Sequence, residues 1–373
     1  MSELYIGLMS GTSLDGIDAA LVDFAEEKIR LVDFLYTPFP DDLRQRISAI
    51  SQPNQPILLK DYGRLDSELG ICFANAVTKL LKQSNCTNRQ IIAIGSHGQT
   101  IYHEPNHYHG FSLQVGDPNR IAHLTGITTI ADFRRRDIAA QGQGAPLVPA
   151  FHQAVFADKH CPRVIVNIGG IANITILNGQ SVQGFDTGPG NTLMDLWHQR
   201  HRHQSYDLNG NWAASGKIDK PLLCALLRDT YFLLPPPKST GKEYFSLPWL
   251  DRILKGFNDL KAEDIQATLC ALTAQSIADA INKYAPSTQQ MYVCGGGVHN
   301  AKLMTLLEQR FAAPVMSTTA LGIDPDGVEA IAFAWLARQT YEGLTGNLCS
   351  VTGAETPVIL GGIYAGNSSL GRK

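Results

Sequence analysis

The sequence predicts an α/β protein built from two halves of the same plan. Short β-rich runs alternate with helical patterns, which is typical of the α/β class. Each half opens with a tight pair of strands, continues through a helix and returns in a strand that ends at a small-residue turn. This repeated order predicts two domains, residues 1–130 and residues 131–373, with part of the C-terminal tail able to return to the first.

The first half is predicted to contain a strand meander, a helix and a further strand. The predicted strands cover residues 4–9, 19–24, 31–37 and 91–96. The first two are joined by so short a loop that they must form a hairpin and not a βαβ unit. From about Ser67 onward, apolar residues recur at helical spacing, which predicts a helix with one buried face.

The second half repeats this order. Its predicted strands cover residues 164–167, 172–177, 183–186 and 291–294. Gly169-Gly170 forms the turn of the hairpin, a helix begins near Thr192, and a longer helix covers residues 265–284.

Composition excludes several classes of protein. Hydrophobic residues make up 44% and charged residues 17% of the 373 residues, as in a globular protein. A net charge of −3 argues against general binding to nucleic acid. No apolar run reaches membrane-spanning length, and Glu3 precedes the first basic residue, Lys28, unlike a signal peptide. Seven cysteines without a CxxC pair indicate reduced thiols, so we expect a cytoplasmic protein that binds neither nucleic acid nor membrane.

Three small-residue loops are the candidates for chemistry. The first is Ser10-Gly11-Thr12-Ser13-Leu14-Asp15-Gly16-Ile17-Asp18, whose glycines and hydroxyls suit the wrapping of phosphate oxygens. Asp15 and Asp18 are candidate Mg²⁺ ligands, acting through water. An ordinary hairpin turn uses the same residue types, so this loop alone is not specific.

The second loop, Phe185-Asp186-Thr187-Gly188-Pro189-Gly190-Asn191, ends a strand and opens a helix. N–H groups at a helix start favour an anion. Asp186 at the strand end is placed as a base or metal ligand would be. The alternative is an Asp that only caps or forms a turn.

The third loop, Cys294-Gly295-Gly296-Gly297-Val298-His299-Asn300, follows a strand. Three glycines predict a flat backbone surface against which an adenine or ribose can lie, although a tight turn is the alternative. The loop does not match the GxGxxG fingerprint, and the chain contains no GxxxxGK[ST] loop.

Together and in this order, the three loops resemble the phosphate-1, phosphate-2 and adenosine motifs of the actin, sugar kinase and heat-shock ATPase superfamily. The resemblance implies two ribonuclease-H-like domains that face a nucleotide cleft.

The motifs resemble one family more closely, the anhydro-N-acetylmuramic acid kinases. The matching blocks cover residues 6–18, 95–100, 166–173, 184–191, 295–300 and 326–330. The resemblance implies an enzyme that uses ATP, Mg²⁺ and water to open 1,6-anhydro-N-acetylmuramic acid and phosphorylate its O6. The product is N-acetylmuramic acid 6-phosphate, an intermediate of cell-wall turnover.

The resemblance also assigns roles. Asp186 is the candidate base for the attacking water, and Glu329 is a second carboxylate that positions the water or binds the sugar. The residues expected at the nucleotide are Gly11, Thr12, Ser13, Leu14, Asp15, Gly16, Ile17, Asp18, Gly188, Gly190, Asn191, Gly295, Gly296, Gly297 and Asn300.

His97, Gln99 and Thr100 follow a predicted strand and are expected to face the sugar. His97 is equally well explained as a hydrogen-bonded core histidine. Arg134-Arg135-Arg136 is interpreted as a solvated turn in which one arginine can bind the carboxylate of the substrate.

Two other functions stay open from the residues. One is an ATP-dependent sugar kinase without ring opening, and the other is an actin-like ATPase switch protein. A homodimer is compatible with the resemblance, but no pattern in the sequence specifies an interface.

Overall fold

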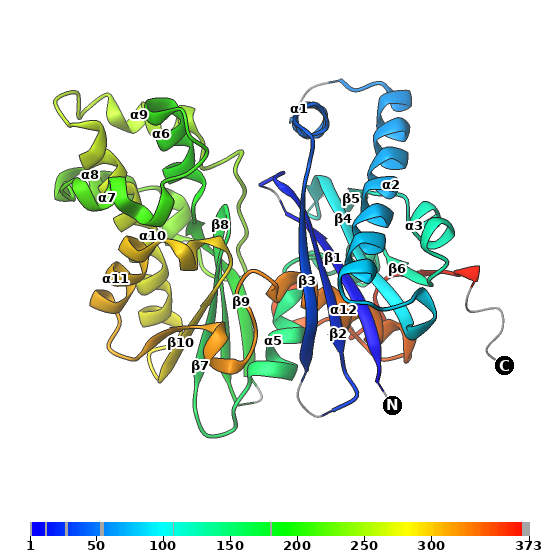
Figure 1. Ribbon diagram of the computed structural model, residues 1–373. Helices are drawn as coiled ribbons and strands as arrows, with labels where there is room; N and C mark the ends of the chain where they lie inside the picture. Colours follow the sequence, from blue (N-terminus) through cyan, green and yellow to red (C-terminus); the bar gives the residue numbers. More distant parts are fainter. Residues whose placement is uncertain are drawn as a thin grey trace. The chain divides into compact units, whose positions relative to one another are not determined.

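The computed structural model describes residues 2–11, 13–26, 29–52, 56–106, 108–179 and 181–367. The chain forms two compact units (Figure 1). Unit 1 combines residues 1–155 with residues 327–373, and unit 2 comprises residues 156–326. The predicted boundary at 130/131 falls inside unit 1, and the part of the chain that returns to unit 1 includes a long helix as well as the tail.

A sheet in the order β12-β6-β4-β1-β2-β3, with β5 paired to β4, forms the centre of unit 1. Its strands are β1 (Leu4–Ser10), β2 (Gly16–Asp23), β3 (Arg30–Pro38), β4 (Ile91–Glu104), β5 (Phe111–Val115), β6 (Thr129–Ala131) and β12 (Gly362–Tyr364). The helices of this part of the chain are α1 (Asp41–Ile50), α2 (Leu59–Gln83), α3 (Pro118–Thr125), α4 (Phe133–Ala139), α5 (Val148–Phe156), α12 (Val328–Tyr341) and α13 (Cys349–Thr352).

Successive residues of β1 serve opposite faces of this sheet. Ile6 and Leu8 lie in the core that includes the apolar side of α2. Gly7 faces the other way, where a Cβ would lie 1.7 Å from the carbonyl oxygen of Ala330 in α12. Gly95 on β4 meets α12 in the same manner. Glycine therefore lets α12 lie directly on two strands far from it in sequence (Figure 1, orange beside blue).

Unit 2 repeats the arrangement in the order β11-β10-β7-β8-β9. Its strands are β7 (Arg163–Ile168), β8 (Ile171–Asn178), β9 (Ser181–Pro189), β10 (Gln290–Cys294) and β11 (Val315–Ser317). Its helices are α6 (Thr192–Arg202), α7 (Asn211–Ser215), α8 (Lys220–Leu227), α9 (Leu247–Leu254), α10 (Ala262–Tyr284) and α11 (Ala301–Arg310).

Both units contain an antiparallel meander, followed by two strands that run parallel to the first strand of that meander. In unit 1, β4 pairs in parallel with β1 and with β6, and in unit 2, β10 pairs in parallel with β7 and with β11. This shared topology confirms the predicted duplication of a ribonuclease-H-like fold.

Two elements extend furthest beyond their predicted bounds. The strand expected to end at residue 96 continues to Glu104, because β5 pairs with its second half. His97, Gln99 and Thr100 therefore lie within β4 and not after it. The helix expected from Ser67 begins at Leu59. Both extensions depend on contacts that the local pattern does not contain.

Candidate active site

Asp186 lies near the end of β9 and is held by a later segment of unit 2. Its backbone N–H donates to the carbonyl oxygen of Lys238 (3.1 Å), and its own carbonyl accepts from the hydroxyl of Tyr231 (2.7 Å). The N–H of Thr240 donates to Asp186 Oδ2 at 3.0 Å. Three hydrogen bonds therefore fix the backbone and one carboxylate oxygen.

The surroundings of Asp186 change its proton affinity. Burial raises the pKa of this carboxyl to about 7, and the negative charge of Glu243 adds to the effect. The N–H of Thr240 and the charge of Lys238 act in the opposite direction. A carboxylate with a pKa near neutrality is suited to accept a proton at physiological pH.

Asp229 holds both ends of the segment that contacts Asp186. Its carboxylate accepts from the N–H of Tyr231 (2.9 Å), the hydroxyl of Tyr244 (2.6 Å) and Nε1 of Trp249 (2.8 Å). The segment of residues 231–244 is thereby closed into a strap, and Thr240 lies within it.

The loop after β9 packs tightly on the turn between β7 and β8. The N–H groups of Gly190 and Thr192 donate to the carbonyl oxygen of Gly170, and the N–H of Asn191 donates to that of Gly169. These three donors, which the sequence assigned to an anion, are thus used within the protein. Gly188 and Gly190 are required by packing, since a Cβ at Gly190 would lie 2.3 Å from the Gly169 carbonyl oxygen and one at Gly188 would lie 2.7 Å from the ring of Phe232.

The three glycines after β10 do not all serve one purpose. A Cβ at Gly295 would lie 2.4 Å from Asn167 Oδ1, and one at Gly297 would lie 2.4 Å from the side chain of Ile168. Only Gly296 has open space, with its nearest neighbour at 3.9 Å. Asn300 caps α11, because its Oδ1 accepts from the N–H of Leu303 (3.0 Å).

The first loop lies in unit 1 between β1 and β2. Gly11, Ser13, Leu14 and Asp15 form the turn, whereas Gly16, Ile17 and Asp18 belong to β2. Thr12 lies outside the described residues.

Two positions of this loop have structural roles. Ile17 has its side chain in the core of unit 1, and a Cβ at Gly16 would lie 2.3 Å from the carbonyl oxygen of Thr37.

The two candidate Mg²⁺ ligands lie close to one side chain. Asp15 is exposed and Asp18 is half-buried. Burial is the main cause that raises the pKa of Tyr36, and the negative charges of Asp15 and Asp18 raise it further. Accessible carboxylates suit a hydrated Mg²⁺ ion, so these residues fit the expected ion. In the part of the chain that the structure describes, no group of three or more His, Cys, Asp or Glu could hold a metal.

His97 is buried and paired with Arg134 of α4. Both Nε and Nη2 of Arg134 donate to His97 Nε2, at 3.1 and 2.9 Å. Arginine has no acceptor, so His97 carries its proton on Nδ1. Burial and the guanidinium of Arg134 lower the pKa of His97 to about 3, which keeps the ring neutral. Nε2 of His97 is thus paired within the protein, whereas its buried Nδ1 has no hydrogen-bond partner among the described residues.

Arg134 binds this histidine and lies within the electrostatic influence of Glu329. Burial lowers the pKa of Arg134 to about 10, whereas the charges of Glu329 and Asp137 raise it, so the guanidinium stays charged at neutral pH. Glu329 is half-buried in the first turn of α12. His97, Arg134 and Glu329 therefore form a polar cluster in unit 1. Arg135, by contrast, is exposed and pairs with Asp132.

The other two predicted sugar ligands have partners within the protein. Ser10 Oγ donates to Oε1 of buried Gln99 at 2.7 Å. Gln114 Nε2 donates to the hydroxyl of Thr100 at 3.2 Å. Gln99 and Thr100 thus tie β4 to its neighbouring strands.

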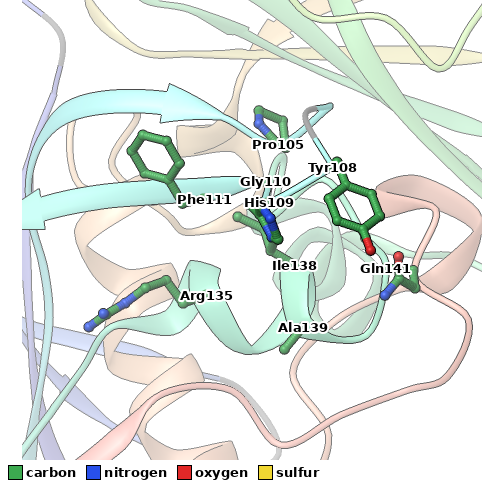
Figure 2. A pocket seen from close by; sticks show the side chains of 10 residues that line it. Pro105, Tyr108, His109, Gly110, Phe111, Arg135, Ile138, Ala139 and Gln141 are labelled. Carbon is green, nitrogen blue, oxygen red and sulfur yellow. The ribbon is translucent and has the colours of Figure 1, made fainter.

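A pocket of about 390 Å³ opens in unit 1 between the β4–β5 hairpin and α4 (Figure 2). Figure 2 shows Arg135, Ile138 and Ala139 along one wall, and Tyr108 and Phe111 on the hairpin. Its lining residues are Pro105, Tyr108, His109, Gly110, Phe111, Arg135, Ile138, Ala139, Gln141 and Gly142. Among them, only Arg135 belongs to a segment that the sequence analysis considered for the substrate.

Sequence reasoning missed the strap that binds Asp186 and the link from His97 to Arg134. Three consecutive prolines at 235–237 favour an extended connection there, but no local signal indicates which residue this segment contacts.

A family model of anhydro-N-acetylmuramic acid kinases matches residues 3–366. The chain belongs to this family. The anhydro-N-acetylmuramic acid kinase of Shewanella oneidensis is 54% identical over 97% of this chain and 98% of its own length. That of Xanthomonas axonopodis pv. citri is 50% identical at the same coverage. Membership of the family of anhydro-N-acetylmuramic acid kinases makes the chain an enzyme of the kinase class.

Among solved structures, an activator of 2-hydroxyisocaproyl-CoA dehydratase from Clostridium difficile with bound ADPNP superposes with a TM-score of 0.48 at 10% identity. The superposition covers 92% of this chain and 96% of that one. The family assignment rests on the sequence relatives. No helix within the described residues has both the length and the hydropathy to cross a membrane.

Proposed function

We propose that this kinase uses ATP and water to convert 1,6-anhydro-N-acetylmuramic acid into N-acetylmuramic acid 6-phosphate and ADP. The names of the relatives support the choice of sugar. The reaction belongs to cell-wall recycling, and we place it in the cytoplasm with a small-molecule sugar as the partner.

The observation that carries the proposal is the state of Asp186. Its carboxyl has a pKa raised to about 7, and within the described residues the hydrogen bond to this carboxyl runs from the N–H of Thr240 to Oδ2. Oδ1 is the atom we assign to the attacking water. Near neutral pH a large fraction of this group is ionised and basic enough to take a proton.

In the proposed reaction, Asp186 removes a proton from water as the water oxygen attacks the anomeric carbon. The bond from that carbon to O6 breaks, and O6 takes the electron pair. O6 then forms a bond to the γ-phosphorus as the bond to ADP breaks. Phosphoryl transfer thus replaces the proton that a glycosidase acid would give to the leaving oxygen.

Glu329 is proposed to position the water or the sugar. It is electrostatically coupled to Arg134, whose guanidinium is held by His97 and by the carbonyl oxygen of Gly144 at 2.8 Å. The hydrogen bonds of Arg134 thus hold in place a positively charged group whose pKa is raised by the charge of Glu329.

We assign the nucleotide to the three small-residue loops, with Gly11, Ser13, Gly296 and the neighbouring loop positions as the parts that approach it. Asp15 and Asp18 would hold Mg²⁺ through water, and the ion would neutralise charge on the phosphates.

The test is a coupled ADP-release assay with ATP, Mg²⁺ and the anhydro-sugar in ¹⁸O-labelled water. Label on the anomeric oxygen together with phosphate on O6 is the expected product. ADP release without label would leave a sugar kinase that opens no ring. The absence of sugar-dependent ADP release would contradict the proposed substrate and favour an ATPase switch.

Asp186→Asn tests the base directly. The amide cannot accept the proton of water but keeps the size of the side chain. We expect kcat to fall by at least about 10²-fold while ADP affinity stays within twofold. Full turnover by this variant would rule out Asp186 as the base.

A further inference from the structure

Two polar side chains from different elements meet at Gly170, in the turn between β7 and β8. A Cβ at Gly170 would lie 2.8 Å from the hydroxyl oxygen of Thr192, the first residue of α6. The same point lies 2.5 Å from Cε and 3.3 Å from Nζ of Lys242. Glycine at this position leaves a space that both the hydroxyl of Thr192 and the ammonium of Lys242 border.

Thr192 lacks the partner that a buried hydroxyl normally has. Its residue is 5% exposed, and its Oγ1 makes no hydrogen bond to any residue that the structure describes. An unpaired buried polar group destabilises the folded state. A ligand that pairs with the hydroxyl explains why threonine is found there.

The chemistry of the place favours an anion. It lies at the start of α6, where the helix dipole favours negative charge. The backbone N–H groups of Gly190, Asn191 and Thr192 already bond to the β7–β8 turn, so side chains have to supply the donors. A lysine ammonium offers three donors and no acceptor, and a threonine hydroxyl offers one. Phosphoryl oxygens are the matching acceptors.

The place is also tied to the proposed base. Lys242 belongs to the strap of residues 231–244, two residues after Thr240, whose N–H binds the carboxylate of Asp186. One short segment thus supplies both a contact to the base and a cation at the start of α6.

We propose that Lys242 and Thr192 bind the oxygens of the phosphoryl group that is transferred, first as the γ-phosphoryl of ATP and then as the sugar phosphate. The inference rests on the proposed function for the identity of the phosphate donor. It adds two side-chain ligands to the backbone loops that the sequence assigned to the nucleotide.

The test compares two nucleotides that differ by this group. ADP and the non-hydrolysable ATP analogue AMPPNP are titrated calorimetrically, with Mg²⁺, into the wild type, Lys242→Met and Thr192→Val. Lys255→Met, which changes an exposed lysine next to α9, is the matched control. Thermal unfolding of each variant checks that it is folded.

In Lys242→Met we expect AMPPNP affinity to fall about tenfold or more while ADP affinity stays within twofold. The kcat should fall about 10²-fold, as when one donor to a developing anion is removed. Thr192→Val should show the same selectivity with a smaller loss, and Lys255→Met should match the wild type.

Equal losses for ADP and AMPPNP, or no loss for either, would overturn the inference. The outcome is separable from the proposed reaction. A wild type that shows the Lys242-dependent difference without phosphorylating the anhydro-sugar would contradict the substrate and retain this phosphate site. Ring opening at full rate in folded Lys242→Met would contradict the phosphate site and retain the proposed substrate.

Discussion

At the scale of single residues, the carboxyl of Asp186 combines two opposed demands. Burial raises its pKa, which makes it a stronger base, while the N–H of Thr240 holds one oxygen in place and moderates the rise. A freely rotating exposed aspartate would be oriented worse and would be a weaker base.

The pH dependence of the reaction follows from this value. In the proposed mechanism the ionised form of Asp186 acts as the base, and burial raises the pKa of this carboxyl to about 7. We therefore expect kcat/KM to rise about tenfold per pH unit below 7 and to level off above it. A profile measured from pH 5 to 9 with a saturating second substrate checks this. An acid limb centred near pH 4 would contradict a raised pKa at the base.

At the residue scale, part of the candidate site could be predicted from local signals. The sequence places Asp186 near the end of a strand and before a helix start, as the structure does, and its role as a base stays a prediction. The roles of Gly297 and Asn300 were not identifiable. Ile168 packs on Gly297, and Asn300 caps α11, and both contacts depend on the folded arrangement. A run of three glycines does not reveal that two of them are needed for packing.

At the scale of elements, the contact of α12 with β1 and β4 depends on the absence of two side chains. Gly7 and Gly95 lie against the helix backbone, so a methyl group at either would collide with backbone atoms that cannot move independently. This contact places Glu329, which lies in the first turn of the same helix.

Gly95→Ala tests this packing. A Cβ there would lie 2.0 Å from the carbonyl oxygen of Phe333. We expect a loss of about 1–3 kcal/mol in the free energy of unfolding, measured by urea titration.

Gly63→Ala is the matched control. Gly63 is an exposed glycine of α2 with no atom within 4 Å of the added Cβ, and its replacement should stabilise by about 0.5–1 kcal/mol. Equal effects of the two substitutions would contradict the close approach of α12.

At the scale of the molecule, unit 1 is discontinuous in sequence and unit 2 is not. Residues 327–373 supply α12, α13 and β12 to unit 1. The buried carboxylate of Asp137 accepts hydrogen bonds from Asn347 Nδ2 (2.7 Å) and Thr352 Oγ1 (2.8 Å), which joins the two chain segments.

Removal of residues 327–373 should therefore affect the two units differently. Unit 1 would lose the helix that covers one face of β1 and β4, whereas the chain of unit 2 stays whole. Hydrogen exchange followed by mass spectrometry should show lost protection in β1 and β4 and retained protection in β7 and β10. Protection of β1 at the level of the full chain would show that unit 1 does not need α12.

Local periodicity and motifs of consecutive residues were sufficient to predict the α/β class, the duplicated plan and the family, and they point to Asp186 as a candidate base. Which distant segments contact one another could be read only from the folded chain. Folding brings residues 231–244 to Asp186, Arg134 to His97, and Lys242 to Gly170. Such contacts depend on packing between distant parts of the chain, and a local sequence pattern does not indicate which distant residue a segment will contact.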